Sequence, residues 1–522
     1  MAGRSKGIVV NETSRPAPPA EAPLTEARPP VPPAQLRIVL AGALLAMLLA
    51  ALDQNIVNTA LPRMAADLGG MAHLSWVVTA FMLTSTTTTP LYGKMSDLYG
   101  RRALFFIAIF LFLGGSIMSG ASQSMGQLIG FRALQGLGAG GLMVLAQAMV
   151  ADVVPPRQRP RYQGLFSGTF GLASVAGPLV GGFITQTLSW RWVFYVNVPI
   201  GVLALVMLAI GLRKKAPGVA RPVDHLGALL LAAATAMLLL LLAWGGTEFP
   251  WASWQTAAMA GGTVGLAGLF LWREAVAPEP LIRLPLFRNP VFARGVAVGG
   301  MMVFAMMGST VFLPLYFQLV LGMAPAEAGA MLVPQVGGML LTSILGGRIV
   351  AKVGRTKPFL LLALGLEAAA LASLGLFAWL AAPAWVFLIS LLTLGLGMGM
   401  GMPNLTTAVQ NAVDHREVGA ATGTMAFLRS LGGALGVATS GTIMAHSLAI
   451  TAAGQGKSLA QLTQQAAQAV TAAEAGAMAL AYRTALTGCF ALSGVVMTAA
   501  LLITLGLPER TLRNRVDDEV RG

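Results

Sequence analysis

The sequence of 522 residues has one cysteine, Cys489, and only four histidines. A single thiol excludes an intramolecular disulfide bond and a cysteine cluster for zinc or iron. The histidines are far apart in the sequence and form no spaced metal-binding motif: His73, His225, His415 and His446. Because no nucleophile beside a base and no phosphate-binding loop is visible, we predict neither an enzyme nor a bound metal or cofactor.

Charged residues are also scarce. They make up 10% of the chain, whereas 56% of the residues are hydrophobic and the mean hydropathy is +0.73, which a soluble domain of this size would not tolerate. Apolar stretches of about 20 residues, enough to cross ~30 Å of hydrocarbon as a helix, recur along the chain. We count fourteen, near residues 38–61, 74–92, 103–120, 127–151, 163–186, 193–212, 226–244, 253–272, 294–320, 327–349, 358–379, 384–405, 418–445 and 485–506. The expected fold class is an all-α polytopic membrane protein with 14 transmembrane helices.

Lysine and arginine outnumber the acidic residues by 34 to 20, which gives a formal charge of +14. If the N-terminus lies inside, 28 of the 34 fall in inner segments, four in outer segments and two within spans. This distribution follows the positive-inside rule and leaves no basic patch for nucleic acid. We therefore expect a multi-pass protein of the cytoplasmic (inner) membrane, with both termini in the cytoplasm.

Two pairs of inner segments match at nearly the same spacing. GKMSDLYGRR at 93–102 matches GRIVAKVGRT at 347–356 with an offset of 254, and residues 161–182 match residues 416–437 with an offset of 255. Both matches join spans that are eight apart and on the same side of the membrane. They indicate two parallel six-helix repeats with two inserted helices, a 6+2+6 plan typical of transporters that rock about a central site.

This repeat sets the expected organisation of the chain. The proline-rich start, with no apolar run, is typical of a disordered tail rather than of a signal peptide. The inserted spans contain no charged residue, so we expect lipid-facing or interface helices. The long outer loop is rich in alanine and glutamine and is expected to form one or two short helices. The predicted segments are a cytoplasmic tail 1–36, a six-helix bundle 37–215, the inserted pair 216–280, a second six-helix bundle 281–507 with the outer loop 446–484, and a cytoplasmic tail 508–522.

Asp53 interrupts the first apolar span, ALLAMLLAALDQNIVNTALP at 43–62. On a helical projection the carboxylate lies among small residues, on a face suited to another helix. Arg132 in span four costs ~2.5–3.5 kcal/mol to insert unless it is paired. The two residues lie ~14 and ~8 Å below the outer surface, so an arginine side chain or one bridging water spans the gap of ~6 Å. The alternative is that Arg132 extends to the outer surface.

Other polar residues within spans are candidates for a central cavity. Gln54, Asn55 and Asn58 cover another arc of span one and cannot all face lipid. Glu367 in span eleven and Arg429 in span thirteen lie at similar depth. These two either pair or leave Glu367 as a second proton or cation site, and a structural role is the alternative.

The loop GKMSDLYGRR by itself predicts a tight turn, in which Asp97 caps the third span and pairs with Arg101 or Arg102. The same residues resemble GxxxDxxGRR, the defining loop of the major facilitator superfamily. The resemblance implies a charge network that latches the two halves in the outward-facing state. The residues that would carry this role are Gly93, Asp97, Gly100, Arg101 and Arg102.

Span five contains GLASVAGPLVGG at 171–182, which by itself predicts a small-residue packing face with a kink. The stretch is similar to the GPxxGG motif that marks antiporters in this superfamily. Ala173 stands where many members have a further glycine. The matching residues are Gly171, Gly177, Pro178, Gly181 and Gly182.

Three more segments resemble motifs of the same superfamily. Arg132 and Gln135 match RxxQGxGxG, in which the arginine takes part in proton transfer. LDQNIVNTALP, with Asn55 in place of the usual threonine, resembles the span-one motif of fourteen-helix drug:proton antiporters. SWRWVFYVNVPIG at 189–201 resembles the segment between spans five and six in that group, and we expect Trp190 and Trp192 to anchor it at the interface.

The resemblance covers residues 37 to about 507 and implies proton-coupled efflux of drugs or other lipophilic or cationic compounds by alternating access. Asp53 and Arg132 would couple substrate to proton, the proton being the coupling ion without any cofactor. The expected partners are small-molecule substrates and the lipid bilayer. The alternative function is an exporter or facilitator of a specific metabolite, such as an amino acid, a siderophore or a sugar. Some relatives work with a periplasmic adaptor and an outer-membrane channel, which no residue here indicates.

Overall fold

The computed structural model describes residues 33–69, 74–212, 224–246, 248–454, 472–509 and 511–512. These residues are helical apart from turns, short 3-10 segments and one isolated bridge. Eleven of the described helices are long and apolar enough to cross a membrane, which confirms the all-α polytopic fold class. The number fourteen stays a prediction. Three helices that match predicted spans are not among the eleven, α2 (Leu74–Tyr99), α9 (Trp254–Val276) and α16 (Val418–Gly454).

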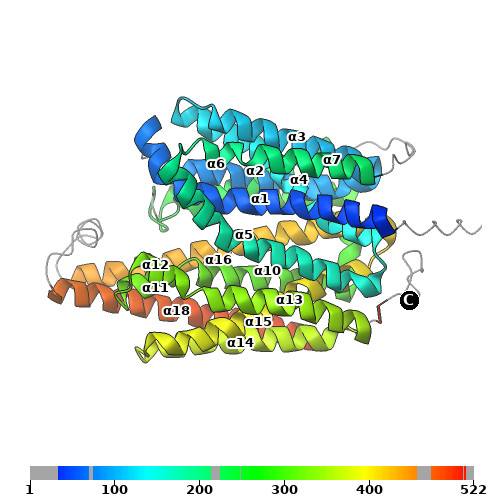
Figure 1. Cartoon of the computed structure of the whole chain (residues 1–522). Coiled ribbons are helices and arrows are strands. Elements are labelled where there is room, and N and C mark those ends of the chain that lie inside the picture. The colour runs from blue at the N-terminus through cyan, green and yellow to red at the C-terminus, as the bar shows by residue number, and fades with distance from the viewer. Residues whose placement is uncertain are drawn as a thin grey trace, which may run out of the picture.

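The first bundle packs six membrane-length segments around a core of apolar side chains (Figure 1). Its last span is interrupted at Val196, between α6 and α7. We call the end of the molecule where α1 begins the basic end and the opposite end the far end. The helices are α1 (Pro33–Leu68), α2, α3 (Arg101–Gly120), α4 (Met125–Val153), α5 (Arg159–Thr187), α6 (Trp192–Tyr195) and α7 (Asn197–Gly211).

The predicted N-terminal tail is wrong in its last four residues, because α1 already begins at Pro33. Proline is compatible with the first turn of a helix, where its missing N–H would have no partner. The Gln35 amide donates a hydrogen bond to the Gly211 carbonyl at 2.8 Å, which fixes this turn against the end of α7. The remainder of the predicted tails, residues 1–32, 510 and 513–522, lies outside the described residues.

The second bundle repeats this plan with more interruptions (Figure 1). The predicted span 294–320 is divided into α10 and α11, because Pro314 has no N–H to continue the helix. Pro325 and Pro334 likewise stand at the starts of α12 and α13. The helices are α10 (Pro290–Thr310), α11 (Leu313–Leu319), α12 (Pro325–Ala330), α13 (Val333–Val353), α14 (Lys357–Trp379), α15 (Ala384–Asn411), α16 and α18 (Ala472–Leu505).

The predicted outer loop 446–484 is not a separate unit where it is described. Its first residues continue α16 to Gly454, and its last residues belong to α18 from Ala472 onward. The stretch is rich in alanine, so the flanking helices extend instead of ending at the predicted boundaries. Residues 455–471 lie outside the described residues.

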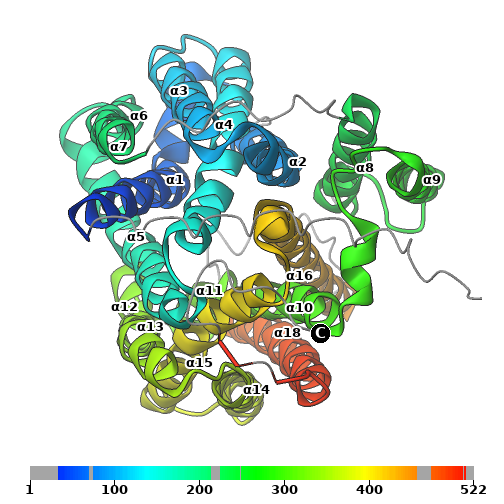
Figure 2. The ribbon, with the colours of Figure 1, turned by 90° about the vertical axis from the view of Figure 1, so that its right-hand side faces the viewer.

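The inserted helices α8 (His225–Trp244) and α9 pack on each other beside the two bundles (Figure 2). Leu229 and Val264 are 64% and 72% exposed, which suits surfaces that face lipid. After α9 the chain returns to α10 through residues 277–289, which we call the strap. Ile282 of the strap is buried in a cluster with Phe427 of α16, so the strap attaches the pair to the second bundle.

The two bundles meet along two helix crossings, α5 with α13 and α2 with α16 (Figure 2). Glycines allow the backbones to touch. A Cβ on Gly93 would lie 2.6 Å from the Gly419 carbonyl oxygen, and one on Gly347 would lie 2.4 Å from the Pro160 carbonyl oxygen. Gly93 and Gly347 are equivalent in the sequence repeat, so equivalent glycines make a close backbone contact in each of the two crossings.

Candidate functional site

Asp53 lies in the middle of α1 and is fully buried. Arg132 of α4 donates to its Oδ2 through Nη1 at 2.6 Å. The amides of Gln135 and Asn197 both donate to Oδ1, each at 2.8 Å. Charge-assisted bonds of this kind are about twice as strong as neutral ones, and they compensate a carboxylate that has lost its water. The structure thus joins Asp53 and Arg132 directly.

Arg132 is 1% exposed and does not extend to the surface, so that alternative is wrong. Its Nη1 also donates to the Gln135 amide oxygen at 2.8 Å. The guanidinium lies over the Phe81 ring, 4.1 Å from the centroid, and 5.8 Å from the centroid of Phe194. A buried guanidinium gains a cation–π attraction from such rings. Arg132 therefore has partners besides Asp53.

Asn197 is a member of the site that the sequence analysis missed. It stands at the first position of α7, in the segment that we expected only to anchor the chain. Its amide donates to Asp53 and, at 3.0 Å, to the Ser116 hydroxyl. The signal that could have found it is a single asparagine at the start of a long apolar stretch. In the same segment, Trp192 is exposed, but Trp190 is buried and donates to Asp67 at 2.8 Å.

The other polar residues of α1 lie toward α5 or the surface. Asn58 is exposed, and Gln54 and Asn55 are partly buried. The Asn55 amide donates to the Ala51 carbonyl of its own helix at 2.8 Å. None of these three therefore joins the Asp53 cluster through a described hydrogen bond.

The glycines of the predicted antiporter motif let α5 lie directly on its neighbours. A Cβ on Gly177 would lie 2.4 Å from Asn55 Cβ, and one on Gly181 would lie 2.3 Å from the Thr59 hydroxyl. Gly171 meets Met339 of α13, whereas nothing lies within 4 Å of a Cβ on Gly182. The helix α5 continues through Pro178 without ending. This arrangement is a close packing face between α1 and the second bundle.

Asp97 connects the two bundles at the basic end. Its carboxylate accepts hydrogen bonds from the backbone N–H of Gly419 at 3.1 Å and of Ala420 at 2.7 Å, at the start of α16. The prediction that it caps the third span is wrong, because α3 begins after Gly100 without a side-chain cap. Asp97 lies beyond the apolar segment of its helix, and burial raises the pKa of this carboxyl to about 6 against the opposing effect of Arg101.

The remaining residues of the predicted latch hold Asp97 in place. Arg101 pairs with Asp97 at 3.0 Å and with Asp152 of α4 at 2.7 Å. Gly100 has a φ of +90°, a conformation that favours glycine. Arg102 does not join the network, since it donates to the Leu212 carbonyl at 2.6 Å. Through Asp97 the network makes two charge-assisted hydrogen bonds between the first bundle and the second.

Glu367 and Arg429 do not form the ion pair that the sequence analysis allowed. Among the described residues no ion pair includes either of them. Arg429 donates through Nη2 to the Thr406 hydroxyl at 3.1 Å, and its Nε has no described partner. Glu367 is 1% exposed in α14. The structure therefore keeps the two candidate charges apart.

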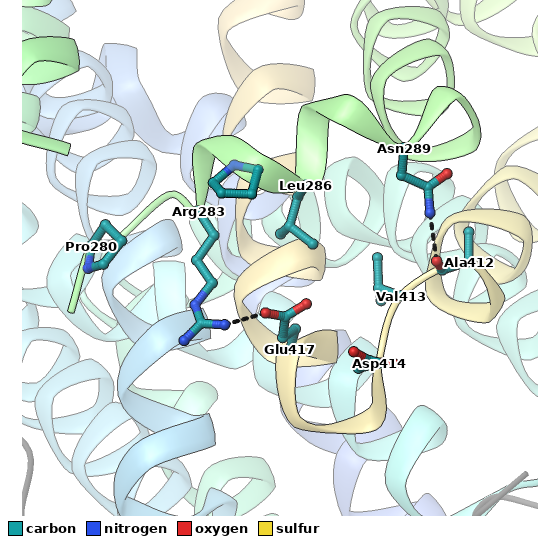
Figure 3. Close-up of a pocket in the computed structure, with 9 residues that line it drawn as sticks. Pro280, Arg283, Leu286, Asn289, Ala412, Val413, Asp414 and Glu417 are labelled. Atoms are coloured by element: carbon teal, nitrogen blue, oxygen red, sulfur yellow. Dashed lines mark hydrogen bonds and ion pairs between the residues drawn. The ribbon is translucent and has the colours of Figure 1, made fainter. Parts of the chain in front are cut away.

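A cavity of about 520 Å³ lies at the basic end, between the strap and the turn that joins α15 to α16 (Figure 3). Arg283 on one side of it pairs with Glu417 on the other, and the Asn289 amide donates to the Ala412 carbonyl at 2.7 Å. These contacts are distant in sequence from the Asp53 cluster, and no residue of that cluster lines the cavity. The described residues contain no group of three or more side chains that could hold a metal ion.

The sequence matches a known protein family over most of its length. The sequence model of the Major Facilitator Superfamily matches residues 43–437. Multidrug transporter protein MdtP of Bacillus subtilis (strain 168) is 36% identical over 412 residues, 78% of this chain and 75% of that protein. Multidrug resistance protein 3 of the same strain is 34% identical over 413 residues, 79% of this chain and 80% of that protein.

Two solved structures are similar in fold at low sequence identity. The human organic anion transporter MFSD10 (TETRAN) has a TM-score of 0.62 and 16% identity, over 90% of this chain and 99% of that one. The proton:xylose symporter XylE has a TM-score of 0.61 and 16% identity, over 92% of this chain and 98% of that one.

Proposed function

Since the chain belongs to the major facilitator superfamily, we propose that this multi-pass transporter exports drugs or other lipophilic, cationic compounds in exchange for protons. The relatives named as multidrug transporters support the substrate class. The concentration of basic residues in the segments of one side supports an orientation with the basic end and both termini in the cytoplasm. The described state is then closed to the cytoplasm.

The observation that carries the proposal is the buried pair of Asp53 and Arg132. A carboxylate in this position stays ionised only while its counter-charge and donors stay in place. A proton that binds Asp53 removes the charge that holds Arg132, and a substrate cation competes with the proton for that same charge. Because one carboxylate binds either a proton or a substrate cation, but not both, transport of the proton is coupled to transport of the substrate.

Arg132 keeps some of its partners when protonation of Asp53 breaks their ion pair. The Gln135 amide oxygen and the Phe81 ring still contact the guanidinium when Asp53 is neutral. This lowers the free energy of the protonated state relative to a site in which the arginine would be isolated. Exchange at Asp53 is therefore a local rearrangement of a few side chains.

The contacts between the bundles support alternating access. Gly93, Asp97 and their partners on α16 close one end in the described state, and the equivalent crossing of α5 with α13 lies beside them. These are short backbone and hydrogen-bond contacts, which rigid-body rocking of two bundles can break and remake.

The test is proton-driven uptake of ethidium, a monovalent aromatic cation, into liposomes that contain the purified protein. Vesicles with an acidic interior and enclosed DNA report ethidium entry by fluorescence as protons leave. We expect the Asp53→Asn variant to lose this uptake down to the rate of protein-free vesicles. Asp67→Asn is the matched control, because Asp67 lies on the same helix with a side chain that is 55% exposed. Undiminished uptake by Asp53→Asn would sink the proposal.

A further inference from the structure

Glu367 is an isolated carboxyl group in the second bundle. It is 1% exposed and makes no hydrogen bond or ion pair with any described residue, and its Oε1 is completely buried. A neutral polar group buried in this way costs about 1–3 kcal/mol, and an uncompensated charge costs much more. Efficient packing does not explain the residue, because an apolar side chain of similar size would fill the same space without that cost.

The neighbouring helices leave a slot for this side chain. On α15, a Cβ on Gly397 would lie 2.5 Å from Glu367 Cγ, and one on Gly401 would lie 3.0 Å from Glu367 Oε1. Met302 of α10 reaches the same place, since its Cε is 2.6 Å from the Cβ position of Gly401. Two glycines four residues apart thus make room for a carboxyl group at an apolar contact of three helices.

No charge on the surrounding helices neutralises an ionised Glu367. The helix α15 has no charged residue. Arg294 of α10 lies at the basic end and donates to the Gly506 carbonyl, and α18 carries its charges, Glu474 and Arg483, in its first half. Arg429 of α16 donates to Thr406. An ionised carboxyl would have neither water nor a counter-charge, so Glu367 holds a proton in the described state.

We propose that Glu367 is a second proton-binding site, which holds its proton in the described state and releases it in each transport cycle. The inference rests on the proposed function, because this proton is exchanged in addition to the one at Asp53. It assigns one proton site to each bundle.

Arg429 is the cation placed to trigger the release. It touches the same two helices as Glu367, through Gly299 on α10 and Thr406 on α15, and is only partly buried. Gly299 is three residues from Met302, and Thr406 is five residues from Gly401. Because α16 also forms the crossing with α2, the release requires that α16 shifts within the second bundle when this crossing opens, and such a shift brings Arg429 toward Glu367. A guanidinium that approaches the carboxyl favours its ionised form.

The number of protons exchanged in each cycle determines whether transport moves net charge across the membrane. One proton exchanged for a monovalent cation moves no net charge, whereas two protons move one elementary charge in each cycle. A membrane potential then contributes about 2.3 kcal/mol per 100 mV to transport. A potential that is positive inside the vesicle opposes passive ethidium entry but drives protons outward, so it accelerates protein-mediated entry only in the two-proton case.

The experiment measures ethidium entry into proteoliposomes under an inside-positive potassium diffusion potential and, separately, under a pH gradient alone. We expect the wild type to respond to both. The Glu367→Gln variant should retain at least half of the entry driven by the pH gradient and lose the response to the potential. Glu327→Gln is the matched control and should retain both, because Glu327 is exposed at the far end.

Two results overturn the proposal: a wild type without a response to the potential, and a Glu367→Gln variant that keeps the full response. If the variant loses ethidium entry under both the pH gradient and the potential, infrared spectroscopy tests whether Glu367 is protonated. The carbonyl stretch of protonated carboxyl groups should be weaker in Glu367→Gln than in the wild type by the contribution of one group, and equal intensity in both contradicts the assignment. Failure of the proposed function is distinguishable, because the wild type then shows no entry driven by the pH gradient.

Discussion

The two bundles each bury one carboxyl group in mid-membrane, but they treat it in opposite ways. Asp53 accepts three hydrogen bonds, one of them from an arginine. Glu367 accepts none from any described residue and lies against glycines and a methionine. The same chemical group is therefore stabilised as an ion in the first bundle and as a neutral acid in the second. The position of an acid in a span therefore does not determine its charge, which depends on the hydrogen-bond donors that other helices supply.

The largest difference between the two bundles is expected in the loss of stability after each carboxyl group is removed, measured by thermal unfolding in detergent. Asp53→Ala leaves Arg132 buried without its counter-charge, so we expect a loss of about 3–5 kcal/mol. Glu367→Met removes a buried group that has no partner, so we expect no loss or a small gain. Equal destabilisation by the two substitutions would contradict the assigned charge states.

A second prediction compares one buried asparagine amide in each bundle. Asn197 donates to Asp53, whereas Asn404 in the second bundle donates to the Met400 carbonyl of its own helix at 2.7 Å. Asn197→Leu should lower the free energy of unfolding by about 1.5–3 kcal/mol, because a bond to a charged group is lost. Asn404→Leu, the matched control, should lower it by about 1 kcal/mol or less. A larger effect of Asn404→Leu would show that the donors of Asp53 are not the distinguishing feature.

A third prediction compares ion pairs at the two ends of the molecule. At the basic end, Lys94 of α2 pairs with Glu279 of the strap at 2.8 Å, with side chains 6% and 12% exposed. At the far end, Arg191 and Asp67 are 3.9 Å apart and more exposed. Double-mutant cycles to alanine should give a coupling free energy of about 1–2 kcal/mol for the first pair and below about 0.5 kcal/mol for the second. Similar values would mean that the strap does not hold the first bundle.

The smallest expected effect is a dependence of stability on pH through Glu274, which follows the apolar part of α9. Burial raises the pKa of this carboxyl to about 7, against the opposing effect of the Ile282 N–H, which donates to it at 2.7 Å. The folded protein then binds more protons at this group than the unfolded chain, so stability falls as the pH rises. Between pH 6 and 8 the loss should be about 1 kcal/mol in the wild type. Glu274→Gln should remove the part of that slope that comes from Glu274 and leave the smaller part from Asp97.

Helix geometry alone predicted the pairing in the first bundle. Depth and projection placed Asp53 and Arg132 within reach of each other, because both side chains start from regular helices at known distances from the span ends. Asn197 could not be found in this way, since the interruption between α6 and α7 determines where its amide points.

The wrong predictions concern contacts between elements that are far apart in the sequence. The sequence placed Asp97 beside the helix that follows it, but α16 supplies two N–H groups that are 322 and 323 residues away. Glu367 and Arg429 have similar depth, yet Glu367 lies against Gly397 and Gly401 of α15, whereas Arg429 donates to Thr406, so no ion pair joins them. The inserted helices expose many apolar side chains, and their lipid-facing role stays a prediction, while the strap contacts with both bundles had no signal in the sequence.

The central claim, that a proton and a substrate cation compete for Asp53, is tested most directly by proton release. Ethidium is added to purified, weakly buffered protein, and the change in pH is recorded. Because linkage is reciprocal, a cation that binds only when Asp53 is ionised must release protons from every molecule in which Asp53 is protonated before binding. The measurement is therefore made at acidic pH, where part of the protein carries a proton on Asp53. We expect release by the wild type and by Asp67→Asn, and none by Asp53→Asn. Equal release by Asp53→Asn would contradict competition at this carboxyl group.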